Sequence, residues 1–370
     1  MTAFLSCRTA FAAGALLFCF AAPVAAAPPG PFTSTVLVTS DPVDHPGQIT
    51  DTGLKNAWGI SYAPSGPFWV SSSGAGTSPL YRVDPVTQAT TKLDLTVAIP
   101  GAGVTGQVFN KAAATSFGGN VFLFVNGDGT VSGWRPALGT SAETLVPAAA
   151  NRSYTGAAFA TVGDHGYLYA SNVGAGTIDV YKGSDAAPAL EGSFVDPGLP
   201  AGYTPFNVQN LADTLYVSYV GREPGSDGVI NRFDLQGNFL GRVADGGPLN
   251  APWGLAIAPS SFGDWAGALL VGNFGDGRIS AYDPDSFALL GQLQGADGQP
   301  LVLDGLWALT PGNDQAAGSS SLLYYSAGPE GETEGVFGVL RPVPEPGTWL
   351  MMAGGLAMLA FARRSRRGQA

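Results

Sequence analysis

The sequence predicts an all-β protein, a six-bladed β-propeller of four-stranded blades. A pair of residues recurs six times along the chain. Its first residue is bulky or β-branched, and its second is small in most copies. The pairs lie at 58–59, 105–106, 155–156, 206–207, 253–254 and 307–308. Successive copies are 47 to 54 residues apart, close to the ~40–50 residues of a propeller blade. With 53 Gly and 28 Pro among 370 residues and only 12% charged residues, many tight turns around a large apolar core are expected.

Each repeat predicts a series of strands. The first strand carries the repeated pair, and the second is rich in aromatic and β-branched residues. Second strands are expected at 68–71, 121–125, 167–171, 215–219, 269–272 and 322–326. Third strands, mostly introduced by glycine-containing turns, are expected at 80–84, 130–134, 177–181, 229–234, 278–283 and 336–340. Fourth strands are expected in five repeats, at 92–96, 144–146, 190–194, 239–243 and 289–293.

The sixth repeat has no fourth strand of its own. Residues 33–39 alternate as a strand does and precede the first repeat, so we expect them to complete the sixth blade and protect its edge. The small residues of the repeated pair are expected to leave room where the first strands converge on the axis. Trp58, Trp253 and Trp307 are interpreted as wedges between adjacent blades, the alternative being the lining of a ligand channel.

The N-terminal segment predicts a secretory signal peptide over residues 1–27. Arg8 precedes an apolar run over 10–22 and a stretch of small residues, which is the order typical of such signals. The apolar run is too short for a membrane-spanning helix. Cys7 and Cys19 both lie in this segment, so the exported body is expected to contain neither a thiol nor a disulfide.

The C-terminal segment has three parts in a fixed order. Pro344, Glu345 and Pro346 are followed by an apolar stretch over 350–362 and an Arg-rich run over 363–367. This arrangement resembles a PEP-CTERM sorting signal. The resemblance implies export, transient anchoring in the inner membrane by a short helix, and processing by an exosortase-type enzyme, with a final place on the outer surface or outside the cell. The alternative, a permanent anchor, is disfavoured because the helix would span only about 21 Å of a ~30 Å hydrocarbon core.

The chain therefore divides into a signal peptide over 1–27, a propeller body over 28–341 and a sorting signal over 342–370. The body also resembles a conserved, functionally uncharacterised bacterial propeller family that occurs with PEP-CTERM signals. This resemblance implies a fold and a location, and no chemistry. The matching stretches are 56–60, 199–207, 250–256, 272–277 and 304–309.

The charge of the body disfavours one class of partner. Residues 28–341 contain 12 Lys and Arg against 27 Asp and Glu, a net charge of −15. Such a surface repels phosphate backbones. Nucleic-acid binding is therefore not expected.

A candidate metal set lies just before or at the first strands. It consists of Asn56, Asn207, Asn250 and Asp304, which we expect at one mouth of the central channel. Oxygen ligands of this kind suit Ca²⁺ or Mg²⁺, and the set is similar to that of six-bladed sugar-lactone hydrolases, which hold a divalent ion at the axis. The alternative is that these residues cap turns.

No catalytic motif accompanies this set. The sequence contains no zinc-hydrolase motif, no Gly-x-Ser-x-Gly elbow and no phosphate-binding loop. His45 and His165 lie in turn sequences and are expected to be solvated loop residues.

Two functions remain for the body, of which the first needs no cofactor. The first is a non-catalytic surface or extracellular-matrix propeller that binds an envelope polysaccharide or protein. The second is a Ca²⁺-dependent, lactonase-like hydrolase acting at the channel mouth. The first is favoured because the sequence shows no general base with a recognisable partner, and therefore no catalytic residue.

Overall fold

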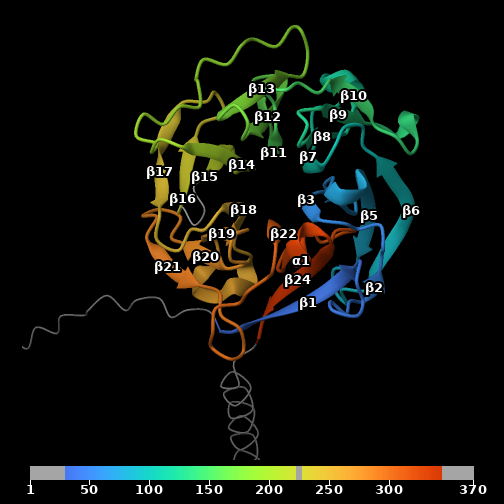
Figure 1. Ribbon diagram of the computed structural model, residues 1–370, viewed down its shortest axis with the longest axis vertical. Coiled ribbons are helices and arrows are strands. Elements are labelled where there is room, and N and C mark those ends of the chain that lie inside the picture. The colour runs from blue at the N-terminus through green and yellow to red at the C-terminus, as the bar shows by residue number, and fades with distance from the viewer. Residues whose placement is uncertain (1–29, 222–226, 344–370) are drawn as a thin grey trace, which may run out of the picture.

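The computed structural model describes residues 30–221 and 227–343. Over these residues the chain forms six β-sheets arranged as blades around a central axis (Figure 1). The six-bladed propeller predicted from the repeats is thereby confirmed. The expected signal peptide and Pro344, Glu345 and Pro346 lie outside the described residues.

Each blade begins with its strand nearest the axis, and the strands then follow in chain order outward, except that two strands from the start of the described chain complete blade six (Figure 1). Blade one contains β3 (Ala57–Ser61), β4 (Phe68–Ser72), β5 (Thr77–Val83) and β6 (Thr90–Ala98). Blade two contains β7 (Val104–Phe109), β8 (Phe122–Asn126), β9 (Val131–Trp134) and β10 (Glu143–Val146). Blade three contains β11 (Tyr154–Val162), β12 (His165–Asn172) and β13 (Thr177–Lys182).

The remaining blades follow the same plan. Blade four contains β14 (Tyr203–Leu211), β15 (Thr214–Gly221), β16 (Gly228–Phe233) and β17 (Phe239–Asp245). Blade five contains β18 (Pro252–Ile257), β19 (Leu269–Asn273), β20 (Ile279–Tyr282) and β21 (Leu289–Gln292). Blade six contains β22 (Leu306–Pro311), β23 (Leu323–Ala327) and β24 (Val336–Pro342), with β1 (Phe32–Thr39) and β2 (Ile49–Thr50) outside them. The short helix α1 (Pro329–Glu332) and 3₁₀ turns at Ser73–Ala75, Phe117–Gly119, Pro136–Leu138 and Ser260–Trp265 complete the elements.

The predicted ring closure by the N-terminal strand is confirmed. Strand β1 pairs antiparallel with β24 from Phe32 opposite Pro342 to Thr39 opposite Val336. Strand β2, which sequence reasoning did not anticipate, pairs in parallel with β1. The buried carboxylate of Asp51, just after β2, accepts hydrogen bonds from Tyr81 Oη (2.6 Å) and Lys92 Nζ (2.7 Å) of blade one. The N-terminal segment therefore joins blade six to blade one.

The prediction of a fourth strand at 190–194 in blade three is wrong. Gly192 N donates to Gln236 O (2.9 Å) and Phe194 N donates to Gly237 O (3.0 Å), so this segment bonds to a turn of blade four. Phe194 packs with Phe233 of that blade, at 5.5 Å between ring centroids. The apolar pattern correctly indicated the burial of Phe194, but the backbone of this segment bonds to the neighbouring blade, and β13 is the outer strand of blade three.

The chain after Phe194 is held by the buried carboxylate of Asp196. This group accepts hydrogen bonds from Arg242 Nη2 (2.5 Å), Asn231 Nδ2 (3.0 Å) and Gly198 N (2.7 Å). Burial alone raises its pKa, but Arg242 and the two amide donors outweigh burial and lower the pKa of Asp196 below its usual value. The ionised form is therefore favoured in the folded protein.

We expect Asp196→Asn to lower the free energy of unfolding at pH 7 by about 2 kcal/mol, because hydrogen bonds to charged groups contribute ~1.5–3 kcal/mol. A lowered pKa adds stability above the unfolded value of ~3.9, and this stability is lost as the pH falls through the folded pKa. The difference between the variant and the wild type should accordingly shrink below about pH 4. Urea unfolding at pH 7 and pH 3 measures this, with the exposed Asp185→Asn as control. Equal losses at both pH values would contradict the prediction.

Small residues allow the first strands to approach one another at the axis. A Cβ on Gly59 would lie 2.5 Å from Thr105 O, and one on Gly106 would lie 2.6 Å from Ala157 N. A Cβ on Gly254 would lie 2.7 Å from Trp307 O. These distances are too short for a side chain, so the repeated small residue has the packing role expected from the sequence.

Candidate functional site

Aromatic side chains from four blades meet at the axis. We call this set the tryptophan cluster: Trp58, Phe206, Trp253, Phe274 and Trp307. Trp58 and Trp307 stack with ring centroids 3.5 Å apart, and Phe274 stacks on Trp307 at 4.0 Å. Trp253 lies edge-on to Trp58 at 6.4 Å and to Trp307 at 5.9 Å. Contacts between blades one, five and six therefore converge on one buried cluster.

The interpretation of the tryptophans as wedges between adjacent blades is incomplete for Trp253, which packs on Trp307 of the adjacent blade six and also reaches across the axis. Its Nε1 donates to Thr155 O at 2.9 Å, which links blade five to blade three. These two blades are not neighbours in the ring. Because the first strands converge on the axis, their inward-pointing side chains contact blades on the far side. The cluster therefore separates two ends of the axis, and we call the end at which the first strands begin the mouth.

Asn207, one member of the candidate metal set, lies within strand β14 and not at the mouth. Its Nδ2 donates to Trp253 O (2.8 Å), and its Oδ1 accepts from Val208 N (2.8 Å). Two threonine hydroxyl groups also donate to the next blade: that of Thr105 to Tyr154 O (2.9 Å) and that of Thr155 to Phe206 O (2.7 Å). Asn207 is thus a link between blades four and five, which explains why it replaces a small residue in the repeat.

Asn56 and Asp304 do lie at the mouth, and both contact the segment around α1. Asn56 Nδ2 donates to Glu332 Oε2 (2.7 Å), and Asn56 Oδ1 accepts from Trp307 Nε1 (2.8 Å). Asp304 is exposed and accepts a hydrogen bond from Glu330 N (3.2 Å). The structure therefore brings these two residues to the same loop, where the protein itself supplies their partners.

Asn56 and Asn250 hold different positions relative to the left-handed turn that precedes each of these first strands. Asn56 has φ +46°, and Ala251 and Gly305, which occupy the same position in blades five and six, have φ +46° and +65°. Asn250 and Asp304 precede this turn residue, whereas Asn56 is the turn residue. Asn250 lies against Gly275, on which a Cβ would be 2.2 Å from Asn250 Oδ1. Asn250 thus contacts blade five rather than the loop around α1.

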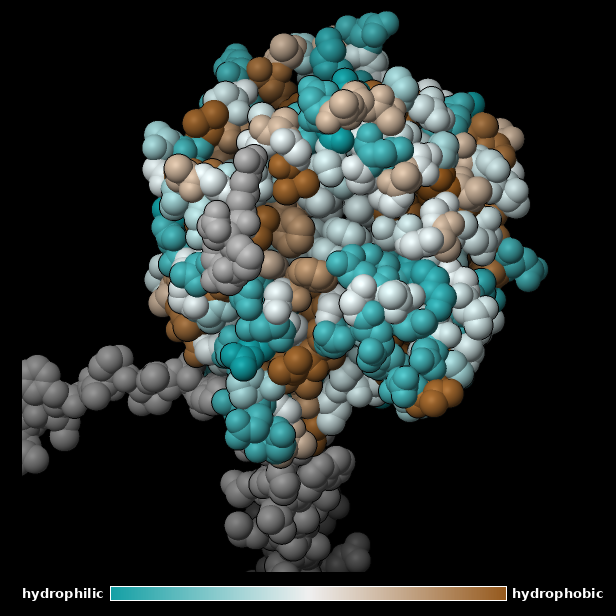
Figure 2. Space-filling model, viewed as in Figure 1, coloured by the Kyte–Doolittle hydropathy of each residue, from teal (hydrophilic) through white to brown (hydrophobic). Residues whose placement is uncertain are grey.

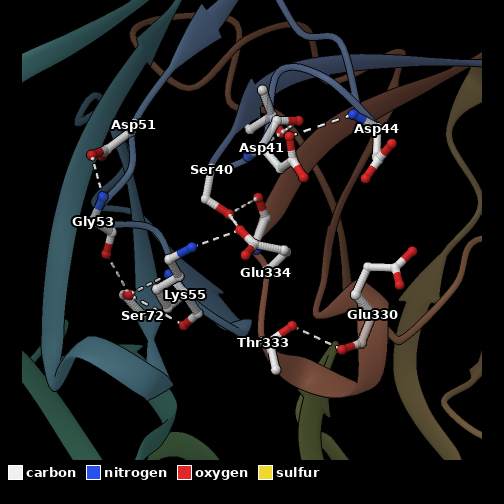
Figure 3. A network of polar contacts seen from close by, with 12 residues as sticks. Ser40, Asp41, Asp44, Asp51, Gly53, Lys55, Ser72, Glu330, Thr333 and Glu334 are labelled. Atoms are coloured by element: carbon white, nitrogen blue, oxygen red, sulfur yellow. Dashed lines mark hydrogen bonds and ion pairs between the residues drawn. The ribbon is translucent and has the colours of Figure 1, made fainter.

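Acidic residues around α1 form a polar network at the mouth. Figure 3 shows Lys55 and Ser40 pointing toward Glu334, whose Oε2 lies 2.6 Å from Lys55 Nζ and 2.5 Å from Ser40 Oγ. Lys55, followed by Ser40, lowers the pKa of Glu334 below its usual value. Hydrophilic residues gather around α1 on the face shown in Figure 2. Within residues 30–221 and 227–343, no group of three or more His, Cys, Asp or Glu is placed to hold a metal ion.

Calcium is expected to leave the melting temperature of the wild type unchanged, because the set does not converge on one point. A ligand that prefers the folded state must raise the melting temperature by mass action. Asp304→Asn should cost at most about 1 kcal/mol, the usual contribution of a cap, because the Asn amide oxygen can still accept the hydrogen bond from Glu330 N. Differential scanning calorimetry with and without Ca²⁺ measures both effects. A calcium-dependent rise that disappears in Asp304→Asn would instead support the metal-dependent hydrolase.

The other end of the axis contains an open cavity of about 240 Å³, which we call the axial funnel. It is lined by residues of the first strands of all six blades, and Trp253 of the tryptophan cluster is one of them. Its lining includes the polar residues Ser61, Gln209, Asn210 and Thr310 and the aromatic residues Tyr62, Phe109 and Phe159. None of the residues that line the funnel is charged. The funnel is therefore a neutral, polar and aromatic site.

Two buried oxygen atoms of the funnel have no hydrogen-bond partner among the described residues. They are Ser61 Oγ and Asn210 Oδ1, and Asn210 Nδ2 is occupied by Phe159 O at 3.0 Å. Buried polar atoms normally have partners. Both atoms are shielded from solvent, so they lie within the wall of the funnel and do not face its open space.

Sequence reasoning missed the funnel, although a signal for it was present. Ser61, Gln209 and Thr310 each lie three residues after the bulky residue of the repeated pair, within otherwise apolar strands. Such polar residues at one repeat position indicate that the position faces a shared polar space.

Comparisons with known proteins show the sorting signal and the fold. Residues 342–367 match the PEP-CTERM protein-sorting motif, which implies export and membrane-anchored sorting by an exosortase-type system. No helix among the residues that the structure describes has the length and apolar character needed to cross a membrane.

The body is similar to proteins that carry no assigned role. An uncharacterised protein of Acanthamoeba polyphaga mimivirus is 29% identical over 286 residues, which cover 71% of this chain and 70% of that protein. A second uncharacterised protein of the same virus is 34% identical over 162 residues, covering 41% of this chain and 42% of that one.

Among solved structures, a mutant α-L-arabinofuranosidase of Fusarium graminearum in complex with an iminosugar inhibitor has a TM-score of 0.52. It is 13% identical, and the match covers 84% of this chain and 98% of that one. At this identity the likeness concerns the fold alone.

Proposed function

We propose that this chain is an exported surface propeller that binds an envelope polysaccharide in the axial funnel, without catalysis. The sorting motif at 342–367 supports the surface location. The observation that carries the binding role is the uncharged funnel, whose lining combines the polar residues Gln209 and Thr310 with the aromatic residues Tyr62 and Phe109.

Binding is favoured over hydrolysis because the funnel offers no group suited to proton transfer at neutral pH. Tyr62 is the titratable side chain in its lining. The Tyr62 hydroxyl donates to Pro311 O at 2.7 Å, and burial raises the pKa of Tyr62 above its usual value. A general base should instead have a pKa near the working pH. The funnel can therefore hold a ligand, but it lacks a base that could activate water.

The two ends of the described body meet at the rim of blade six (Figure 1). Val343 N donates to Pro31 O at 2.6 Å. Strands β24 and β1 are the third and fourth from the axis in that blade. Val343, the last residue that the structure describes, thus lies at the rim of blade six and away from the axis. Attachment at this point leaves the funnel free.

Processing of the sorting signal is the first test. We expect protein isolated from its native host to have lost the C-terminal Arg366 and Arg367, because the motif directs exosortase handling. Intact-mass analysis of the cell-associated protein measures this. A full-length C-terminus would contradict the sorting part of the proposal.

Retention by the host envelope is the second test. We expect the processed wild type to sediment with isolated envelope material, and Gln209→Trp, which fills the funnel, to remain in solution. Periodate treatment of the envelope, which destroys vicinal diols of sugars, should release the wild type, and protease treatment should not. The exposed Ser65→Trp is the matched control, since Ser65 lies outside the funnel. Equal retention of Gln209→Trp and the wild type would overturn the binding site.

A further inference from the structure

We infer that the outer edge of blade three pairs with the same edge of a second copy of this chain, and that this pairing joins copies attached to facing surfaces. The pairing goes beyond the proposed function, and its bridging part rests on the surface location in that proposal. Three observations lead to the inference: the unpaired edge of β13, the regularity of this strand, and its place in the ring.

Strand β13 ends blade three with an unpaired edge. It bonds to β12 on one side, and no backbone hydrogen bond reaches its other side from the residues that the structure describes. Gly183 N, just after the strand, donates to Gly166 O at 2.8 Å, which sets the alternation of the antiparallel ladder. Ile178, Val180 and Lys182 therefore direct their N–H and C=O groups away from β12.

The outer strands of the other blades carry features that discourage further pairing. A register shift, as at a β-bulge, interrupts the pairing of the outer strand with its neighbour in blades one, two, four and five. The outer strand of blade six, β2, has only two residues. Bulges and short strands are devices that protect sheet edges. Among the described outer strands, β13 alone lacks both, because it pairs with β12 over its six residues without a register shift.

Side chains on both faces hold β13 in an extended conformation. On one face, the Asp179 carboxylate accepts hydrogen bonds from Tyr154 Oη (2.7 Å) and Asn172 Nδ2 (3.0 Å). On the other, Ile178 and Val180 are half-buried against the core shared by blades three and four. The strand contains neither Gly nor Pro and is rich in β-branched residues. It is therefore a fixed template to which an extended segment can add a strand.

The occupant that this edge fits is a second β13, because the strand is complementary to itself. An antiparallel pair with its two-fold axis at Val180 places the two copies of Val180 opposite each other and Ile178 opposite Lys182. Every exposed backbone group then meets an exposed backbone group, and no like charges are opposed. A central pair of β-branched residues also favours sheet pairing. Such a contact uses the same patch of both copies, as the common two-fold dimers do.

The place of β13 in the ring determines what the pair would connect. Blade three lies opposite blade six, as Figure 1 shows with β13 at the top and β1 and β24 at the bottom. Val343, which precedes the sorting motif, lies at the rim of blade six. Two copies paired through β13 therefore have their Val343 residues at opposite ends of the dimer. This arrangement bridges two facing surfaces.

The first test is the mass of the exported chain in solution. One strand pair makes a small interface, and interfaces below ~1,200 Å² belong to weak, transient complexes. We expect sedimentation equilibrium to show a monomer at about 10 µM and a rising share of dimer toward about 1 mM. High salt should increase the dimer share, because it screens the repulsion between two bodies of net charge −15 over residues 28–341.

Cysteine cross-linking tests the register. Both native cysteines, Cys7 and Cys19, lie in the predicted signal peptide, and the wild type measures any background from them. Val180→Cys should give a disulfide-linked dimer, because opposed residues have Cα atoms ~5.5 Å apart, within the range of a disulfide. Ile178→Cys and Lys182→Cys should not link with themselves, whereas a mixture of the two should form the mixed disulfide.

Val180→Pro separates pairing from folding. It removes an N–H that points away from β12, and proline is tolerated at such edge positions. The melting temperature should stay close to that of the wild type, while the dimer is lost at every concentration. Val180→Lys opposes two like charges at the two-fold axis and should have the same effect, which covers the case in which the proline variant does not fold. Val180→Thr keeps the N–H and the β-branched shape and is the matched control that should still pair.

Beads that carry the chain through a C-terminal biotin test the bridging of two surfaces. Wild-type beads should aggregate with one another, and Val180→Lys beads should not. A monomer at all concentrations, a dimer that survives in both Val180→Pro and Val180→Lys, or self-linking of Ile178→Cys would overturn the pairing. Dimers in solution without bead aggregation would overturn the bridging part. These failures are distinct from a failure of the proposed function, because Gln209→Trp, which fills the funnel, should pair like the wild type.

Discussion

Deleting residues 30–39 is expected to abolish cooperative unfolding of the body. Strand β1 buries Phe32, Leu37 and Val38, each contributing ~1.5–3 kcal/mol on burial, and its loss exposes the edge of β24. The summed effect of these side chains and the lost strand pairing approaches the total stability of an ordinary domain, about 5–15 kcal/mol. Urea titration followed by circular dichroism and tryptophan fluorescence measures the effect.

A graded pair of variants keeps this prediction testable if the deletion variant cannot be purified. Leu37→Ala removes a fully buried side chain and should cost about 2–5 kcal/mol. Thr33→Ala changes an exposed residue of the same strand and should stay within about 0.5 kcal/mol of the wild type. Similar melting temperatures for the deletion variant and the wild type would show that β1 does not close the ring.

Trp307→Ala is expected to cost about 3–5 kcal/mol, the range for removing a buried aromatic side chain. Trp307 is 1% exposed and stacks on Trp58 and Phe274, with its Nε1 bonded to Asn56 Oδ1. The substitution would leave a cavity at the point where blades one, five and six meet. Equilibrium unfolding in urea measures the loss.

Trp307→Phe divides this effect into two parts. The smaller ring keeps much of the stacking but leaves Asn56 Oδ1 without its donor, which costs about 1–3 kcal/mol. The free energy of unfolding of Trp307→Phe should therefore lie between that of the wild type and that of Trp307→Ala. Leu240→Ala, at an exposed position of β17, is the control and should have little effect. A cost for Trp307→Ala no larger than that of the control would contradict the role assigned to the cluster.

Most strands could be predicted because their signals are local. The alternation of apolar residues over 33–39 and the six repeated pairs indicate strands and blades without knowledge of any distant contact. The strand at 33–39 that closes the ring could also be predicted, because counting the expected strands of each repeat leaves the sixth without a fourth. The exception is 190–194, where the apolar pattern indicated burial but could not show that the buried face contacts blade four.

The candidate site was less predictable because its geometry depends on distant residues. Asn56 and Asn207 were expected to share a metal site, yet one bonds Glu332 and the other bonds Trp253 O. Two facts produced the error. The left-handed turn at Asn56 changes the direction of its side chain relative to Asn250 and Asp304, and Asn207 lies inside a strand rather than before it.

The sequence by itself determined the six repeats, the closing strand, the sorting motif and a strongly acidic body without cysteine. The tertiary structure alone decided that Trp253 reaches across to blade three, that Asn207 links two blades, and that the polar residues at Ser61 and Asn210 share one funnel. The physical reason is the distance along the chain between the groups involved. Repeats and strand patterns arise from neighbours a few residues apart, whereas the axis is formed by first strands that meet only once the whole ring has closed.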